Sequence, residues 1–333
     1  MNPLFKLPLH GVFCVPFCGE NKQKLPHEIT LDFTRFTLNE TLKPIWSMVD
    51  EGERYHSKVS LYKANSNKSC TGSGSFDSSE NIDDSYYLNI NCQGTGSFKV
   101  TNNNITIDWQ AQGTGADHYF QTLAVALNLE LNKVLCIHAN ALAYQDKAIA
   151  IVAPSRTGKT TLTAALSQSG FSLMTDDMVA LHEGEQGYDI YPSWPVARMW
   201  PDALNDIQLN TSEEHQKVHE KFEKRIVNLE KVKDLTFCNE PKKLHVIYLL
   251  NRLPKKQNSN APICEIVPIA TAQAIIVLLQ NSILGSCYRK LNLEKSRVKG
   301  LSKLLENIAF KQINYLSGKE HLGEVGKVIK SDL

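Results

Sequence analysis

The segment from residue 153 to 160, Ala-Pro-Ser-Arg-Thr-Gly-Lys-Thr, constrains this chain more than any other feature. It follows a short apolar run and precedes a stretch with helical spacing of apolar residues. A strand, a loop and then a helix that begins at Gly-Lys-Thr is the context that a phosphate-binding loop requires. In such a loop, backbone N–H groups and the positive end of the helix dipole face the phosphates. The segment therefore predicts a site for the phosphates of ATP.

The predicted phosphate site comprises the loop and the residue that follows it: Ala153, Pro154, Ser155, Arg156, Thr157, Gly158, Lys159, Thr160 and Thr161. The Lys159 ammonium group can reach the β- and γ-phosphates, and the Thr160 hydroxyl can ligate Mg²⁺. Ala153 replaces the glycine that usually opens this pattern, so the backbone there must not need a positive φ. Arg156 can equally well point into solvent.

A pair of aspartates, Asp176 and Asp177, follows the next predicted strand. One helix and one strand separate the pair from Thr160, so the carboxylates should emerge at the same sheet edge as the loop. Phosphoryl transfer to a hydroxyl needs a carboxylate on Mg²⁺ and often a second one that takes the hydroxyl proton. We therefore predict that one aspartate is the general base and that the other, with Thr160, ligates the metal; Asp177 is the candidate ligand, and the sequence leaves open which aspartate takes which role. An Asp pair that caps a turn is the alternative.

The run from Ile137 to Leu181, which holds His138, the loop and the aspartates, resembles the catalytic core of HPr kinase/phosphorylase. It is even more similar to the wider group of HPr-kinase-related proteins, which includes kinases of ribosomally made peptides. The resemblance implies an α/β fold with the P-loop core of the HPr kinase C-terminal domain and phosphoenolpyruvate carboxykinase. It also implies an active-site role for His138, and general-base and metal roles for Asp176 and Asp177.

A weaker similarity extends to the Pro- and Trp-rich segment 191–201, which contains Arg198. We expect this segment to be a loop. An arginine there suits a transition state with negative charge on the equatorial phosphoryl oxygens, and Arg198 is accordingly a candidate nucleotide-binding residue. A surface salt bridge is an equally good interpretation of Arg198.

Together these features predict an ATP- and Mg²⁺-dependent kinase that transfers the γ-phosphate to a hydroxyl, on a serine of a peptide or protein or on a small molecule. HPr itself is not the expected acceptor, because Thr161 stands where HPr kinases have glutamate and their Gly-rich C-terminal signature is not found. A catalytically weak nucleotide-binding regulatory protein of the same fold is the alternative, favoured by Ala153 and by the lack of a recognisable further acidic metal ligand. A carboxykinase ranks last, because its arginines and its metal-binding lysine and histidine cannot be placed.

A change in composition and in hydrophobic periodicity predicts two domains: a β-rich N-terminal domain, 1–115, and an α/β catalytic domain, 116–333. Residues 27–109 are rich in Asn, Ser, Thr and Gly and contain short alternating stretches typical of strands. Helical and strand patterns alternate after residue 117, which is typical of an α/β domain. The polar stretch 65–84 predicts a surface loop, and the charged stretch 212–232 predicts a helix with i,i+4 ion pairs.

Composition excludes several classes of protein. The formal net charge of +1 gives no basic surplus for nucleic acid or an anionic membrane. No apolar run approaches the roughly 20 residues that span a bilayer, and the segment 1–19 lacks the apolar stretch of a signal peptide, so we expect it to belong to the folded protein. The eight cysteines are scattered without a zinc pattern, which predicts reduced thiols and a cytoplasmic location. The sequence leaves open whether the chain forms a homo-oligomer.

Overall fold

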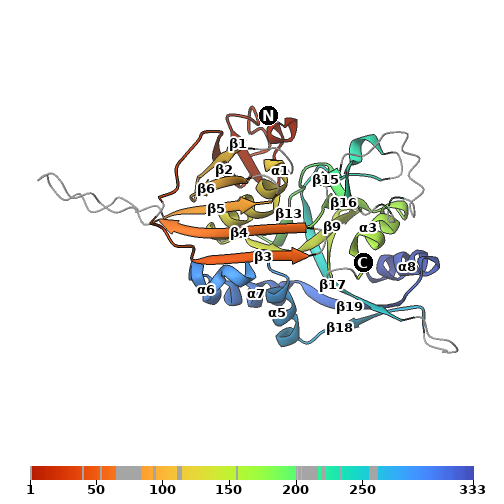
Figure 1. Cartoon of the computed structure of the whole chain (residues 1–333). Helices are drawn as coiled ribbons and strands as arrows, with labels where there is room; N and C mark the ends of the chain where they lie inside the picture. The colour runs from red at the N-terminus through yellow and green to blue at the C-terminus, as the bar shows by residue number, and fades with distance from the viewer. Residues whose placement is uncertain are drawn as a thin grey trace, which may run out of the picture. The chain divides into compact units, whose positions relative to one another are not determined.

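A computed structural model describes residues 2–39, 41–52, 55–64, 84–92, 95–110, 115–154, 157–199, 201, 204, 217–219, 222–232, 235–254 and 262–333. The chain packs as two compact units, one of Met1–Leu7 and Phe13–Asn132, the other of Pro8–Val12 and Lys133–Leu333. The fold is mixed α/β with several sheets (Figure 1). No helix in the described part of the chain is long and apolar enough to cross a membrane. Most of the predicted loop 65–84 lies outside the described residues.

A seven-stranded sheet in the order β1-β2-β7-β6-β5-β4-β3 forms most of the first unit. Apolar and polar residues alternate along these strands, so that one face of β6, with Phe98 and Val100, is buried. Strands β6 and β7 form an antiparallel hairpin. The strand bounds are β1 Val12–Val15, β2 His27–Asp32, β3 Trp46–Gly52, β4 Tyr55–Ala64, β5 Ser85–Asn91, β6 Thr95–Val100 and β7 Asn104–Trp109.

A helical segment follows this sheet, in the order α1 (Ala116–Tyr119), a π-helical turn (Phe120–Ala124) and α2 (Val125–Leu131). The side chain of Asn128 donates hydrogen bonds to the carbonyl oxygens of Thr101 and Asn102, at 2.8 and 2.9 Å. These bonds attach the segment to the turn between β6 and β7. We expected the second domain to begin at residue 116, whereas the compact units divide after Asn132.

The second unit is built on a nine-stranded sheet, whose main path runs β11-β9-β10-β17-β13-β12-β8, with β19 beside β17 and β18 beside β19. The strand bounds are β8 Leu135–Ile137, β9 Ala139–Tyr144, β10 Lys147–Val152, β11 Ser172–Thr175, β12 Val179–Gly184, β13 Gly187–Ile190, β17 Lys242–Leu253, β18 Cys264–Pro268 and β19 Ala309–Leu316. The helix bounds are α3 Lys159–Gln168, α5 Thr271–Gln280, α6 Tyr288–Leu291, α7 Glu294–Asn307 and α8 Leu322–Asp332.

Five neighbouring strands lie in the order β11-β9-β10-β17-β19. The segments that follow β10, β11, β17 and β19, and the segment that precedes β9, all lie at one edge of the sheet. The strands β10, β17 and β19 are parallel, so all three end at that edge. Strand β9 is antiparallel to β10 and therefore begins there, and β11, antiparallel to β9, ends there. In α/β sheets the carboxyl ends of parallel strands are where ligands bind.

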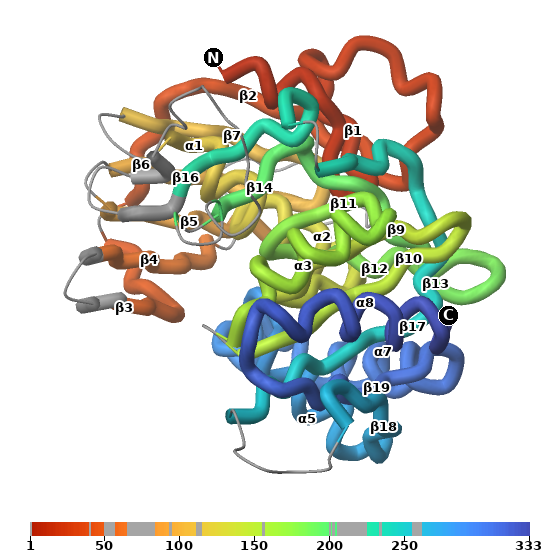
Figure 2. The backbone as a smooth tube through the Cα atoms, turned by 90° about the vertical axis from the view of Figure 1, so that its right-hand side faces the viewer, coloured from red at the N-terminus to blue at the C-terminus, as the bar shows by residue number. Residues whose placement is uncertain are grey.

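Helices cover both faces of the sheet because its central strands are apolar on both sides. On β10, Ile149 and Ile151 belong to one hydrophobic cluster, and Ala148, Ala150 and Val152 to the other. The first cluster includes Leu162, Leu166, Val325 and Ile329, from α3 and α8. The second includes Ala274, Leu278, Leu301 and Leu304, from α5 and α7. Helices α3 and α8 lie side by side on their face (Figures 1 and 2).

The helix predicted for the charged stretch 212–232 is wrong for the part that the structure describes. Residues there form β15 (Lys217–His219), β16 (Phe222–Asn228) and a short 3₁₀ turn. Strand β16 pairs with both β15 and β14 (Val196–Met199) in a three-stranded sheet. Pairing with β14 buries the β-branched Val227 and overrides the helical spacing of the charges. Arg198, expected in a loop, lies on β14.

A five-residue segment near the N-terminus, Pro8–Val12, belongs to the second unit. The backbone N–H of His10 donates to the Pro192 carbonyl oxygen at 2.8 Å, and the His182 ring nitrogen Nε2 donates to the His10 carbonyl oxygen at 2.7 Å. Burial, with the neighbouring His182, lowers the pKa of His10 to about 3, so its ring stays neutral. These bonds attach the segment to β12 and to the chain that follows β13.

The packing of α3 on the sheet predicts a large loss of stability when its buried face is trimmed. Leu166 is fully buried, so Leu166→Ala should lower the free energy of unfolding by about 2–5 kcal/mol. Ile276 on α5 is 56% exposed, and Ile276→Ala should change the same quantity by no more than about 0.5 kcal/mol. Urea denaturation measures both, and equal losses would contradict the packing described.

Candidate functional site

The predicted phosphate loop connects the end of β10 at Val152 to the start of α3 at Lys159. Gly158 precedes the helix with φ +96°, a left-handed conformation that glycine adopts without strain. Ala153 is buried and is not among the described residues with positive φ, so alanine suits the first position of the loop. Thr157 donates its N–H to the Pro154 carbonyl oxygen at 3.3 Å. Ser155 and Arg156 lie outside the described residues.

The first turn of α3 carries Lys159, Thr160 and Thr161, all of them partly exposed. Since no acidic residue lies in this turn, the positive end of the helix dipole is not neutralised locally. Backbone N–H groups at the start of a helix have no partners within the helix itself. The start of α3 is therefore suited to bind an anion.

The aspartates form a tight turn between β11 and β12. The N–H of Met178 donates to the Asp176 carbonyl oxygen at 2.9 Å, and Asp177 has φ +65°. Asp176 is buried, and its Oδ2 accepts a 2.8 Å hydrogen bond from the backbone N–H of Arg198. Asp177 is partly exposed. The structure thus brings Arg198 next to the aspartate pair through its backbone.

The register of the sheet places His138 opposite this turn. Thr175 pairs with Ala141 in β11 and β9, and Val179 pairs with Ile137 in β12 and β8. Both pairs belong to one register, so residues 176–178 lie across from residues 138–140. The backbone N–H of His138 donates instead to the Asn281 carbonyl oxygen, at 2.6 Å. The ladder of strand pairs is therefore interrupted at His138 on one side and at the aspartates on the other.

Asn140, which the motif analysis did not single out, connects the helix to the aspartate turn. Its side chain is fully buried. The Nδ2 group donates to the Thr163 hydroxyl on α3 at 3.0 Å, and Oδ1 accepts the N–H of Asp177 at 3.2 Å. The signal in the sequence was a single amide within the apolar run from 139 to 143. A buried amide that satisfies two elements at once holds them at a defined separation.

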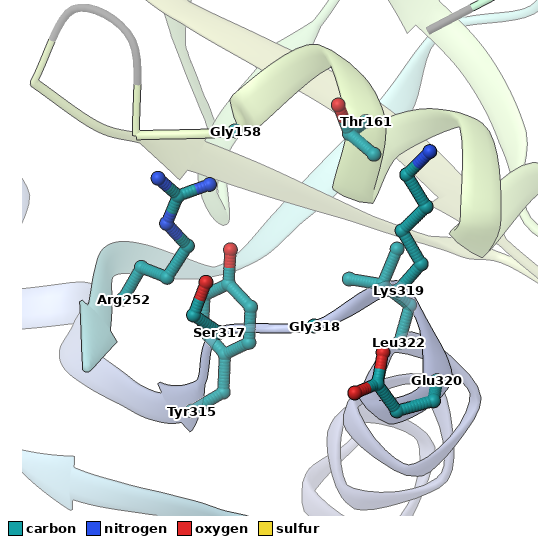
Figure 3. Close-up of a pocket in the computed structure, with 9 residues that line it drawn as sticks. All are labelled: Gly158, Thr161, Arg252, Tyr315, Ser317, Gly318, Lys319, Glu320 and Leu322. Atoms are coloured by element: carbon teal, nitrogen blue, oxygen red, sulfur yellow. The ribbon is translucent and has the colours of Figure 1, made fainter. Parts of the chain in front are cut away.

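Arg252, Tyr315 and Lys319 also lie near the loop and were not predicted. They come from the ends of β17 and β19 and the residues that follow, and with Gly158 and Thr161 they line a pocket (Figure 3). Burial raises the pKa of the Tyr315 phenol, while the nearby Arg252 acts in the opposite direction. The only sign of these residues in the sequence is that they are polar and lie at or just after the ends of two apolar strands.

The donor set at this edge is compatible with Mg²⁺ held together with a nucleotide. Mg²⁺ commonly takes one or two carboxylates, with phosphate oxygens and water completing its shell. Asp177 supplies a carboxylate and Thr160 a hydroxyl. In the described part of the chain, no group of three or more His, Cys, Asp or Glu side chains is placed to hold a metal ion.

Comparison with known proteins gives distant similarity to solved structures. No model of a known protein family matches the chain, and no curated protein does. Among solved structures, the chain is similar to the Hpr(Ser) kinase/phosphatase from Coxiella burnetii, with 15% sequence identity and a TM-score of 0.33. The match covers 59% of this chain and 95% of that one. The function therefore has to be argued from the residues of this chain.

The Asn140 bridge leads to a prediction about stability. Asn140→Ala would leave the Asp177 N–H and the Thr163 hydroxyl without this partner, which should cost about 1–3 kcal/mol of unfolding free energy. The control is Asn307→Ala, which removes an exposed amide from the end of α7 and should cost less than about 0.5 kcal/mol. Chemical denaturation compares the two variants. If they lose the same stability, the amide of Asn140 does not hold the turn to the helix.

Proposed function

We propose that the chain is an ATP- and Mg²⁺-dependent kinase with a P-loop core, and that it transfers the γ-phosphoryl group to a hydroxyl of a peptide, a protein or a small molecule. The observation that carries the proposal is the arrangement at one sheet edge. There the predicted phosphate loop and the aspartate turn emerge two strands apart, and Asn140 connects the turn to α3, the helix that follows the loop. A phosphate-binding loop beside a fixed carboxylate pair is what phosphoryl transfer requires.

The phosphates are bound by backbone N–H groups at the start of α3, by the helix dipole and by Lys159. These groups would stabilise the negative charge that develops on the phosphoryl oxygens during transfer. Bound Mg²⁺ would neutralise charge on the β- and γ-phosphates, and Thr160 with Asp177 would hold it. The side chain of Arg198 is a further candidate to contact a phosphate.

The two aspartates differ in their surroundings, which supports different roles. One carboxylate oxygen of Asp176 is fixed by the Arg198 N–H, and the residue is buried. Such a carboxylate is held in one orientation, as a general base that must meet a hydroxyl proton requires. The partial exposure of Asp177 favours it as the metal ligand. His138, whose backbone lies opposite the turn, is a candidate to orient an aspartate or to contact phosphate.

Removal of the loop ammonium group should abolish transfer. Lys159→Met is expected to lower the rate of ATP turnover about 100-fold or more, because a fixed cation on the transferring group is lost. The acceptors in this assay are water and a panel of hydroxyl compounds and serine peptides. Lys299→Met, at an exposed position on α7, is the matched control and should turn over ATP like the wild type. Unchanged turnover by Lys159→Met would refute the proposed role of the loop.

The two aspartate variants should differ in their response to magnesium. Asp177→Asn is expected to need a higher Mg²⁺ concentration for half-maximal turnover, because a metal ligand is weakened. Asp176→Asn is expected to lower kcat by about 100-fold or more with little change in the Mg²⁺ requirement, because a base is lost. Titrations of Mg²⁺ at saturating ATP separate the two effects. The assignments fail if neither variant is impaired.

A regulatory nucleotide-binding protein is the competing function. The conformation at Ala153 removes one argument for it, because that position does not have the positive φ that would require glycine. Calorimetric binding of ATP with no phosphorylation of any acceptor, water included, would favour this alternative over the kinase.

A further inference from the structure

A further part of the sheet edge adjoins the predicted phosphate loop on the side away from the aspartates. In the strand order β11-β9-β10-β17-β19, the loop follows β10, and the aspartates follow β11 on one side. The residues that follow β17 and β19 lie on the other side. A triphosphate whose γ-phosphoryl group meets the aspartates must therefore extend its α-phosphate end towards β17 and β19.

A pocket of about 470 Å³ lies where that end of the triphosphate would point. This volume is within the range of roughly 300–1,000 Å³ that is usual for small-molecule sites. Its lining includes Thr161, the residue after the loop threonine, so the pocket begins at the first turn of α3 (Figure 3). The remaining lining residues are Gly158, Arg252, Tyr315, Ser317, Gly318, Lys319, Glu320 and Leu322.

Polar groups of the pocket are arranged with cations towards the loop. The Arg252 Nη1 atom lies 3.8 Å from the position that a Cβ on Gly158 would take. The Lys319 ammonium group points towards the helix at Thr161, whereas the Glu320 carboxylate lies on the side away from the loop (Figure 3). In the described part of the chain, no salt-bridge partner is found for Arg252.

Tyr315 anchors the pocket to the loop. Its phenol is buried and donates a 3.4 Å hydrogen bond to the Thr157 carbonyl oxygen. Burial raises the pKa of this phenol, so at neutral pH it keeps the proton that it donates. The wall of the pocket and the backbone at Thr157 are thus held together, and a ligand that contacts both meets groups that are already in place.

We infer that this pocket receives the ribose and base of the nucleoside triphosphate, and that Arg252 positions the phosphates nearest the nucleoside. The inference rests on the proposed function, whose phosphate site it extends. The order of charges matches such a ligand, because cations face the phosphate end and a carboxylate, which accepts hydrogen bonds from sugar hydroxyls, lies farther out. The phosphoryl acceptor then approaches from the side of the aspartates.

The test compares two ligands that share phosphates and differ in the nucleoside. Calorimetry measures the binding of a non-hydrolysable ATP analogue and of inorganic tripolyphosphate, both with Mg²⁺. The wild type should bind the ATP analogue at least about 10-fold more tightly, because only this ligand fills the pocket. Ser317→Phe fills the pocket and should weaken the ATP analogue about 10-fold while tripolyphosphate binds as before. Arg252→Ala should weaken both ligands about 10-fold, because a charge-assisted hydrogen bond to phosphate is lost.

Matched controls are Ser296→Phe and Arg289→Ala, at exposed positions on α7 and α6, which should bind both ligands like the wild type. The inference is overturned if Ser317→Phe binds the ATP analogue normally, or if it loses both ligands equally while remaining folded. Equal affinity of the wild type for the two ligands also overturns it, and this measurement does not depend on any variant folding. In each of these outcomes the wild type still binds tripolyphosphate, whereas failure of the wild type to bind either ligand refutes the proposed function itself.

Discussion

The parallel pairing of β10 with β17, and of β17 with β19, is the constraint on which the candidate site depends. Parallel neighbours need long crossovers, and here these crossovers supply the helices that cover the sheet: α3 lies between β10 and β17, and α5 and α7 lie between β17 and β19. All three strands consequently end at one edge. The loop, Arg252 and the residues after β19 meet there although they are distant in sequence.

The aspartate side of this edge depends on a different interaction, a gap in an antiparallel ladder. Pairing of β11 with β9 ends at Thr175 and Ala141, and pairing in the same register resumes between β12 and β8 at Val179 and Ile137. Asn140 fills part of the gap with its amide, which satisfies one group on α3 and one in the turn. A buried amide is costly unless both ends are paired, so it favours one arrangement of turn and helix over all others.

Local chemistry explains which elements could be located from the sequence. The strand before the loop, the helix after it and the strand that leads to the aspartates follow from apolar runs and turn residues within a few dozen positions. Arg252 and Tyr315 could not be found in this way, because their approach to the loop is a product of strand pairing between segments some hundred residues apart. The prediction of a helix around β16 failed for the same reason. The charges there have helical spacing, and only the pairing with β14 shows that the stretch forms a strand. The composition of the sequence changes just before the helical segment 116–131, yet this segment packs with the earlier strands. Asn128 binds the turn between β6 and β7 and so attaches the segment to them.

The chain passes between the two compact units three times, after Leu7, after Val12 and after Asn132. No single cut therefore yields two intact pieces. A fragment that starts at Lys133 lacks the carbonyl oxygen of His10, to which the His182 ring donates, and the N–H that binds Pro192. The far N-terminus is thus a structural part of the unit that carries the candidate site. Dissection of this protein requires the 8–12 segment to be supplied as a peptide, or grafted by circular permutation, if the isolated second unit is to keep its native contacts.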